Sequence, residues 1–264
     1  MNETKQITAG NQSISDGRRG WRRHWKVYAT AFSGFLLILV LGFYFSLPDV
    51  SYLKSHHPRR TRLMEIRIRQ AKEEGKRYRI RQYWVSFGRI PRLLKQSVRI
   101  SEDASFYFHN GVDFTELKES IKKNLAKGRF ARGGSTITQQ LAKNLYLSPE
   151  KTILRKVREF FIARRLESTL SKNRIFHLYL NVIELGRGIF GVQAAARYYF
   201  GKNVQDLNLE EIVRLTAIIP RPLTVRPTGR SRWLRWRCRW ILHKLLRYRY
   251  ITREQYDQTI AAFR

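Results

Sequence analysis

The chain concentrates its chemically informative residues in three segments: EDASFYFHNGVD at residues 102–113, GGSTITQQLAKN at 133–144 and RKVRE at 155–159. Two carboxylates, Glu102 and Glu159, stand at the outer ends of this stretch. Between them lie hydroxyl, amide and cationic side chains that a plain helical core does not need. The pattern therefore predicts an active site, and the rest of the chain is interpreted as its support.

Two helix starts are visible inside this stretch. Asp113 followed by Glu116, and Thr136 followed by Gln139, are capping-box patterns, so each predicts the first turn of a helix. The glycine-rich and basic residues 127–134 join these two helices and are expected to form a mobile loop beside the site.

A third helix is expected from residue 152 to residue 170. Its predicted core-facing side chains are Ile153, Val157, Phe160 and Phe161. Strand-like alternation is weak, and the one candidate for a short strand lies at residues 83–87. The predicted fold class is therefore all-α.

An uncharged apolar run at residues 27–47 predicts a transmembrane helix. At about 1.5 Å per residue it spans about 31 Å, which matches the hydrocarbon core of a bilayer. Five basic residues precede it, so the N-terminus is predicted to be cytoplasmic and the bulk of the chain extracytoplasmic. A cleaved signal peptide and a buried core helix are the alternatives; the run is long for a signal peptide, and no Ala-x-Ala site follows it.

The expected domain organisation follows from these boundaries and from composition. It comprises a basic cytoplasmic N-terminus (1–26), the membrane anchor (27–47), a basic juxtamembrane linker (48–82), a catalytic domain (83–228) and an Arg/Trp-rich helical tail (229–264).

The chain is strongly basic, with 52 Lys and Arg against 20 Asp and Glu, a net charge of +32. Such a charge implies a polyanionic partner: nucleic acid, anionic lipid or a phosphate-bearing substrate. The basic residues are spread along the chain without a nucleic-acid-binding motif, which argues against nucleic acid. The single Cys238 excludes an internal disulfide.

The candidate chemical groups divide into one base and several cations. Glu102 lies close in sequence to Phe106 and Phe108, and partial desolvation would raise its proton affinity, as a general base requires. The alternative is a surface Glu paired with an Arg. The cations near both carboxylates would stabilise a departing diphosphate, or would form a solvated basic face; they are Lys143, Arg155 and Lys156.

Other sequence patterns are weaker indicators of function. GRGIFG at residues 186–191 has the spelling of a dinucleotide fingerprint, but the preceding residues 175–181 look helical, so we reject it and expect a tight helix–helix connection. No His or Cys pair has zinc-ligand spacing, so no metal site is predicted, while Mg²⁺ or Mn²⁺ stays open as a cofactor. In the tail, the tryptophans of residues 232–250 lie either on an anionic membrane or against the core.

Together, the motifs resemble monofunctional biosynthetic peptidoglycan transglycosylases of glycosyltransferase family 51. The match runs from about residue 84 to residue 226 and includes, besides the three segments, LYLN at 178–181 and GVQAAA at 191–196. The resemblance implies a lysozyme-like, two-lobed helical domain after a single membrane anchor, located at the bacterial inner membrane with its catalytic domain in the periplasm. It also implies a substrate, lipid II, which is polymerised into β-1,4-linked glycan strands with inversion and release of undecaprenyl diphosphate.

Site roles are carried over from the same resemblance. Glu102 is the implied general base on the acceptor sugar, and Glu159 joins the cations in holding the donor diphosphate. The further residues expected to bind substrate are Asp103, His109, Arg132, Ser135, Thr136, Gln139, Gln140, Lys143, Asn144, Arg155, Lys156 and Asn181. The sequence departs from the family pattern at His177, where many members have Glu, so lobe packing is expected to differ there.

Two other function classes compete with this interpretation. A lysozyme-like glycan-cleaving enzyme would use two carboxyl groups, but has no use for cations beside the second one. A membrane-anchored scaffold or nucleic-acid-binding protein would account for the charge, but not for the two carboxylate motifs. The expected partners are lipid II, the growing strand, anionic headgroups and other cell-wall synthesis proteins, with no nucleic acid.

Overall fold

The computed structural model describes residue 25 and residues 27–126, 134–150 and 152–264. It forms two compact units, residues 1–48 and residues 49–264, which we describe separately. The helices of the second unit are α2 (Arg62–Glu73), α3 (Arg92–Glu102), α4 (Phe114–Ala126), α5 (Ile137–Tyr146), α6 (Ile153–Thr169), α7 (Lys172–Val182), α8 (Val192–Phe200), α9 (Leu209–Ala217), α10 (Arg232–Arg247) and α11 (Arg253–Ile260). Short 3₁₀ turns lie at Ser51–Lys54, Phe87–Arg89, Val204–Asp206 and Ala261–Phe263. The prediction of a helical fold is confirmed.

The predicted helix starts coincide with capping side chains. Thr136 accepts a hydrogen bond from the backbone N–H of Gln139, and the Gln139 side chain accepts one from the N–H of Thr136, which confirms the capping box of α5. Asp113 Oδ1 accepts from the N–H of Glu116 at 2.9 Å and so caps α4. These side chains satisfy N–H groups that a helix start leaves unpaired.

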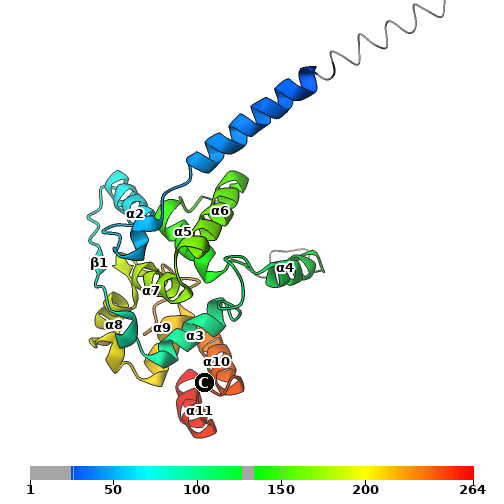
Figure 1. Ribbon diagram of the computed structural model, residues 1–264. Coiled ribbons are helices and arrows are strands. Elements are labelled where there is room, and N and C mark those ends of the chain that lie inside the picture. The colour runs from blue at the N-terminus through cyan, green and yellow to red at the C-terminus, as the bar shows by residue number, and fades with distance from the viewer. Residues whose placement is uncertain (1–24, 26, 127–133, 151) are drawn as a thin grey trace, which may run out of the picture. The chain divides into compact units, whose positions relative to one another are not determined.

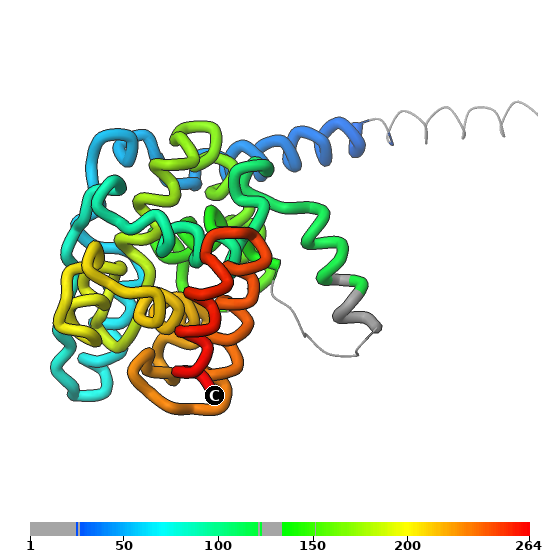
Figure 2. The backbone as a smooth tube through the Cα atoms, turned by 90° about the horizontal axis from the view of Figure 1, so that it is seen from below, coloured from blue at the N-terminus to red at the C-terminus, as the bar shows by residue number. Residues whose placement is uncertain are grey.

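The helices pack in two groups (Figures 1 and 2). In one group α5 packs against α2, α6 and α7, and in the other α3 packs against α9 and α10. Helix α10 also packs against α11, through which the C-terminus joins the second group. Glu102 ends α3 and Glu159 lies on α6, so the two carboxylates come from different groups.

A three-stranded sheet in the order β1-β3-β2 joins distant parts of the chain. Strand β1 (Arg81–Gln82) pairs parallel with β3 (Ile189–Phe190), which pairs antiparallel with β2 (Glu184–Gly186). The strand expected at residues 83–87 is therefore wrong, because the pairing residues lie just before it. The GRGIFG motif forms the β2–β3 hairpin rather than a simple helix–helix connection. A Cβ on Gly191, whose φ is +81°, would lie 2.5 Å from the Asn181 carbonyl oxygen.

Helix α6 begins and ends as expected but faces the other way. Its buried residues are Glu159, Ile162, Ala163 and Leu166. Ile153 is 87% exposed, and Val157 and Phe161 are exposed as well. The core-facing prediction for these side chains is therefore wrong. Within the RKVRE motif, Glu159 is the buried residue, whereas Lys156 and Val157 are exposed.

The regions expected as linker and tail are folded into the same unit as the rest. Residues 49–82 bury Leu53, Met64 and Ile66, and Arg67 makes a bidentate ion pair with Glu184 at 2.8 and 2.9 Å. In the tail, α10 buries five apolar side chains, namely Leu234, Cys238, Ile241, Leu242 and Leu245. Both regions therefore belong to the packed domain.

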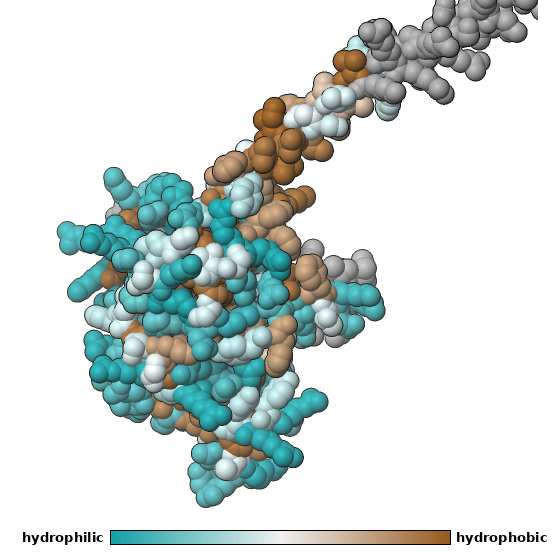
Figure 3. Space-filling model, viewed as in Figure 1, coloured by the Kyte–Doolittle hydropathy of each residue, from teal (hydrophilic) through white to brown (hydrophobic). Residues whose placement is uncertain are grey.

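In the first unit, one helix is long and apolar enough to cross a membrane, Val27–Phe45, with a mean hydropathy of 2.0. Its surface is predominantly hydrophobic (Figure 3). The basic residues that precede it and the loop residues 127–133, including Arg132, lie outside the described residues.

Candidate active site

Glu102 is the last residue of α3, and its side chain is only 10% exposed. Burial raises the pKa of its carboxyl above the usual value, while Arg237, Gln140 and Ser101 act in the opposite direction. Of the two phenylalanines expected beside it, Phe106 is fully buried, whereas Phe108 is 88% exposed. The carboxylate is therefore a stronger base than an exposed Glu.

Gln140, on α5, orients one oxygen of this carboxylate. Its Nε2 donates to Glu102 Oε2 at 3.3 Å, while its Oε1 accepts from the hydroxyl of Tyr179 at 2.9 Å. Burial raises the pKa of Tyr179 well above its ordinary value, so this hydroxyl keeps its proton and its donor role. The chain Tyr179–Gln140–Glu102 thus fixes which end of the Gln140 amide faces the base.

The other carboxylate oxygen faces Arg237, which comes from α10. Arg237 Nη2 lies 3.3 Å from Glu102 Oε1 and 2.9 Å from the Ser101 hydroxyl. Its Nε is buried and has no hydrogen-bond partner among the described residues. The guanidinium stacks over the Trp240 ring at 4.3 Å. The sequence interpretation missed Arg237, because it lies 135 positions from Glu102 in a tail where Arg is abundant.

Glu159 is 3% exposed, and it sits in a different electrostatic environment. It forms ion pairs with Arg155, four residues earlier on α6, and with Lys156, three residues earlier. Lys156 Nζ also donates to the Ser135 hydroxyl at 3.1 Å, which links this cluster to the residues before α5. The predicted grouping of Glu159 with cations is therefore present in the geometry.

Lys143, on α5, completes the positive cluster. Burial lowers the pKa of its ammonium group; Glu159 opposes this effect, and Arg155 and Lys156 add to it. Arg155 Nε is buried without a hydrogen-bond partner in the described part of the chain. A cluster of three cations around one carboxylate keeps a net positive charge, which suits an incoming anion.

Several predicted binding residues make contacts within the protein. The Asp103 carboxylate accepts from the Ile137 N–H at 3.0 Å and contacts His109 Nε2 at 3.0 Å, so it caps α5 and holds the loop after α3. Asn181 is fully buried and bonds both the N–H and the carbonyl of Val85. Gln139 caps α5, as described above. Asn144 is buried on the same helix.

A cavity of about 1220 Å³ opens beside Glu102. Its lining includes Ser135, Thr136 and Gln140 from the α5 region, Asp103 and His109 from the loop after α3, and Arg237 with three tryptophans from α10. Those tryptophans are Trp233, Trp236 and Trp240. They therefore line the cavity of the base, a contact that the interpretation of the sequence did not include.

His177 bridges neighbouring segments. Its Nε2 lies 2.9 Å from the Val85 carbonyl oxygen, and its ring meets those of His57, Trp84 and Phe87 edge-on. Among residues 27–126, 134–150 and 152–264, no group of three or more His, Cys, Asp or Glu side chains could hold a metal ion.

The chain is similar in sequence to known proteins. A family model described as Transglycosylase matches residues 69–246. A biosynthetic peptidoglycan transglycosylase of Nitrosospira multiformis is 36% identical over 224 residues, which cover 85% of this chain and 96% of that protein. The protein of the same description from Dechloromonas aromatica is 45% identical over 166 residues, covering 63% of this chain and 72% of that one.

A solved structure is also similar. The crystal structure of penicillin-binding protein 1A from Haemophilus influenzae aligns with a TM-score of 0.39 and 20% identity, covering 69% of this chain and 17% of that chain.

Proposed function

Since the chain belongs to the transglycosylase family, we propose that it is a peptidoglycan glycosyltransferase that polymerises lipid II into β-1,4-linked glycan strands. The observation that carries the proposal is the contrast between its two buried carboxylates. Glu102 has a raised pKa beside a large cavity, whereas Glu159 is held by cations. One base and one cationic pocket are what displacement of a diphosphate by a sugar hydroxyl requires.

On the acceptor side, Glu102 removes the proton from the sugar 4-hydroxyl as that oxygen attacks the donor's anomeric carbon. A sugar hydroxyl is a poor nucleophile, and a desolvated carboxylate is a suitable base for it. Gln140 holds one carboxylate oxygen by an amide hydrogen bond, and Arg237 holds the other by a single ion pair at 3.3 Å. Direct attack opposite the leaving group inverts the configuration at that carbon.

On the donor side, the diphosphate leaves as the new glycosidic bond forms. Arg155, Lys156 and Lys143 neutralise the negative charge that develops on it, and Glu159 positions the first two of these cations. Ser135, already bonded to Lys156, adds a hydroxyl at the same place. Thr136, which lines the cavity of Glu102, and the buried Asn144 are further proposed substrate-binding residues, as is Arg132, which lies outside the described residues.

Glycan cleavage is the second candidate reaction for this site. A glycosidase places a second carboxyl group free to act as acid, base or nucleophile. Glu159 does not fit that role, because two cations occupy its oxygens. Its surroundings favour a transferase.

The proposal places the protein in the bacterial inner membrane through helix Val27–Phe45, with the N-terminus cytoplasmic and the catalytic domain periplasmic. Lipid II is confined to the bilayer, so an anchored enzyme searches a surface rather than a volume. Deleting residues 1–48 removes one compact unit and leaves the other entire. We expect the deletion to lower polymerisation in liposomes more than in detergent; equal loss in both would contradict a tethering role.

Incubating the purified full chain with labelled lipid II, and separating the products by length, tests the proposed activity. Elongated strands support the transferase. Shortening of pre-formed glycan, with no elongation, would support the glycosidase instead.

A further inference from the structure

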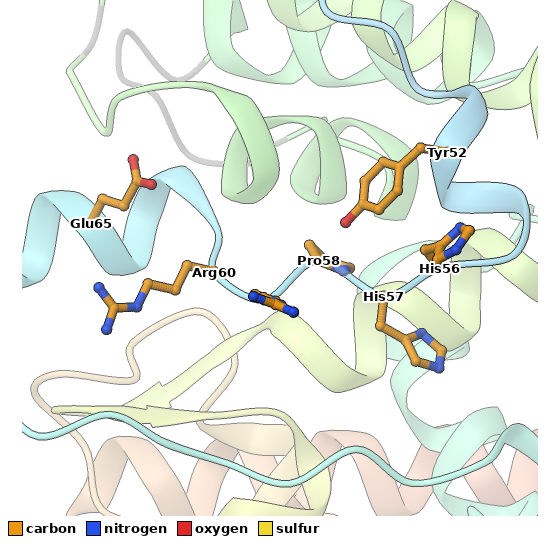
Figure 4. Close-up of a pocket in the computed structure, with 7 residues that line it drawn as sticks. Tyr52, His56, His57, Pro58, Arg60 and Glu65 are labelled. Atoms are coloured by element: carbon orange, nitrogen blue, oxygen red, sulfur yellow. The ribbon is translucent and has the colours of Figure 1, made fainter.

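A second cavity lies away from the catalytic residues, just after the membrane anchor in the chain. Its volume is about 640 Å³. Figure 4 shows its lining side chains along one stretch of chain and on the first turn of α2. The lining consists of Tyr52, His56, His57, Pro58, Arg59, Arg60 and Glu65, none of which lines the cavity of Glu102. We call it the juxtamembrane pocket.

The walls of the juxtamembrane pocket are fixed by contacts with α7. Arg174 donates to the carbonyl oxygens of Leu53 at 2.7 Å and of His56 at 2.6 Å. The His57 ring stacks on Trp84 with centroids 4.1 Å apart. Leu53 is fully buried. The stretch is thus built into the domain, so its side chains are presented in a defined arrangement.

The charge of the juxtamembrane pocket is not neutralised from within. Its one carboxylate, Glu65, forms an ion pair with Arg62 at 3.2 Å. Arg59 and Arg60 are exposed, and neither forms an ion pair within the described part of the chain. The lining thus combines two guanidinium groups with a Tyr hydroxyl and imidazole rings, which are donor groups suited to a phosphate.

The anchor points to the source of that phosphate. Tyr52 follows Phe45, the last residue of the apolar helix, by seven positions. At no more than 3.6 Å per residue, the tether between them is at most about 25 Å long. A pocket on so short a tether stays within reach of the membrane surface, where anionic headgroups attract basic segments.

We propose that the juxtamembrane pocket binds the phosphate of an anionic phospholipid headgroup and thereby seats the domain on the membrane. The inference rests on the proposed membrane anchorage but not on the identity of the reaction. Arg59 and Arg60 supply the charge, Tyr52 and His56 supply further hydrogen bonds, and Arg174 holds the framework.

The test uses the full chain in phosphatidylcholine nanodiscs and titrates it with dihexanoylphosphatidylglycerol below its micelle concentration. The variant Arg59→Gln/Arg60→Gln is compared with Arg77→Gln/Arg79→Gln, which removes the same charge from exposed positions of the same region. We expect at least about tenfold weaker binding for the first pair, because each lost charge-assisted hydrogen bond lowers the affinity by about that factor or more. The wild type and the second pair should bind alike.

Two outcomes would overturn the proposal. Equal weakening by both pairs of substitutions would mean attraction to net charge rather than to a pocket. Inorganic phosphate binding as tightly as the lipid would assign the site to a free anion. Polymerisation of lipid II in detergent is measured on the same samples; its absence from the wild type, with lipid binding intact, would count against the proposed function alone.

Discussion

Glu102 and Glu159 are the same residue type, and both are largely buried, yet their surroundings differ. Glu102 has one guanidinium at 3.3 Å and one amide at 3.3 Å, and its pKa is raised by burial. Glu159 is in direct contact with two cations. The difference shows that a buried carboxylate whose charge is only partly compensated acts as a base, whereas a buried carboxylate paired with two cations holds those cations in place.

The largest effect should come from Glu102→Gln, which removes the base while preserving shape. We expect the polymerisation rate to fall about 100- to 10,000-fold, the usual contribution of general-base catalysis. Rates are measured with labelled lipid II on protein shown by circular dichroism to be folded. The control is Glu73→Gln, whose carboxylate is exposed and makes only a long ion pair, of 4.0 Å, with Arg69. A variant at Glu102 as active as this control would refute the assignment.

Stability provides an independent check on the same carboxyl. Because its folded-state pKa is raised, its contribution to stability is fully present below the unfolded pKa, near 4.5, and is lost as pH rises through the higher folded value. The wild type should therefore lose stability relative to Glu102→Gln as pH rises above 4.5. Denaturant unfolding at several pH values measures this difference. A constant difference across the range would show that burial does not perturb Glu102.

Glu159→Gln should have the next largest effect, and of a different kind. Removing this carboxylate leaves Arg155 and Lys156 without their shared partner; we expect a cost of about 3 kcal/mol in the free energy of unfolding, the low end for a buried pair, because the Lys156 side chain is 47% exposed. We expect kcat/KM to fall about 100-fold through loss of diphosphate stabilisation. The acidic limb of the pH–rate profile should stay in place, since the base is untouched. A shifted limb would mean that the charge of Glu159 is coupled to the base.

Helices α5 and α6 show which features of the site could be predicted from the sequence and which could not. The capping pair Thr136 and Gln139 was predictable, because a cap is encoded within four residues. The orientation of α6 was not. Hydrophobic periodicity assumes that apolar side chains point inward, whereas here the buried face carries Glu159, and Ile153 is exposed.

The contact between Arg237 and Glu102 could not be predicted from the sequence at all. Glu102 and Ser101 contact it across 135 and 136 positions. No local pattern distinguishes it from its neighbours Arg235 and Arg239, whose guanidinium groups donate instead to the carbonyls of Arg264 and Phe263. Which arginine of α10 faces the base depends on the packing of α10 against α3, and that is a tertiary property.

Arg237→Met should have a smaller effect than either carboxylate substitution. The Arg237 charge lowers the pKa of Glu102, so its removal should move the acidic limb of the pH–rate profile to higher pH. Near that limb we expect about a tenfold lower rate, because less of the base is ionised. The profile of kcat/KM against pH measures the shift.

Arg237→Lys keeps the charge and should return the limb toward its wild-type position, a rescue that a purely structural role would not show. Arg235→Met serves as the control on the same helix, because Arg235 donates to the C-terminal Arg264 carbonyl and not to the site. A limb that moves equally for Arg235→Met would remove the specific coupling to Glu102.

The smallest effect should come from Thr136→Ala, which tests whether both carboxylates share one frame. Helix α5 carries Gln140 toward Glu102 and Lys143 toward Glu159, and Thr136 caps it while donating to the Gly111 carbonyl oxygen at 2.6 Å. Loss of the cap should cost about 1 kcal/mol of unfolding free energy. Thr136→Ser keeps the hydroxyl and should retain most of that stability in denaturant titrations. If one frame serves both sites, Thr136→Ala should also shift the pH limb and raise KM together; a change in only one would mean that the base and the cation cluster are positioned independently.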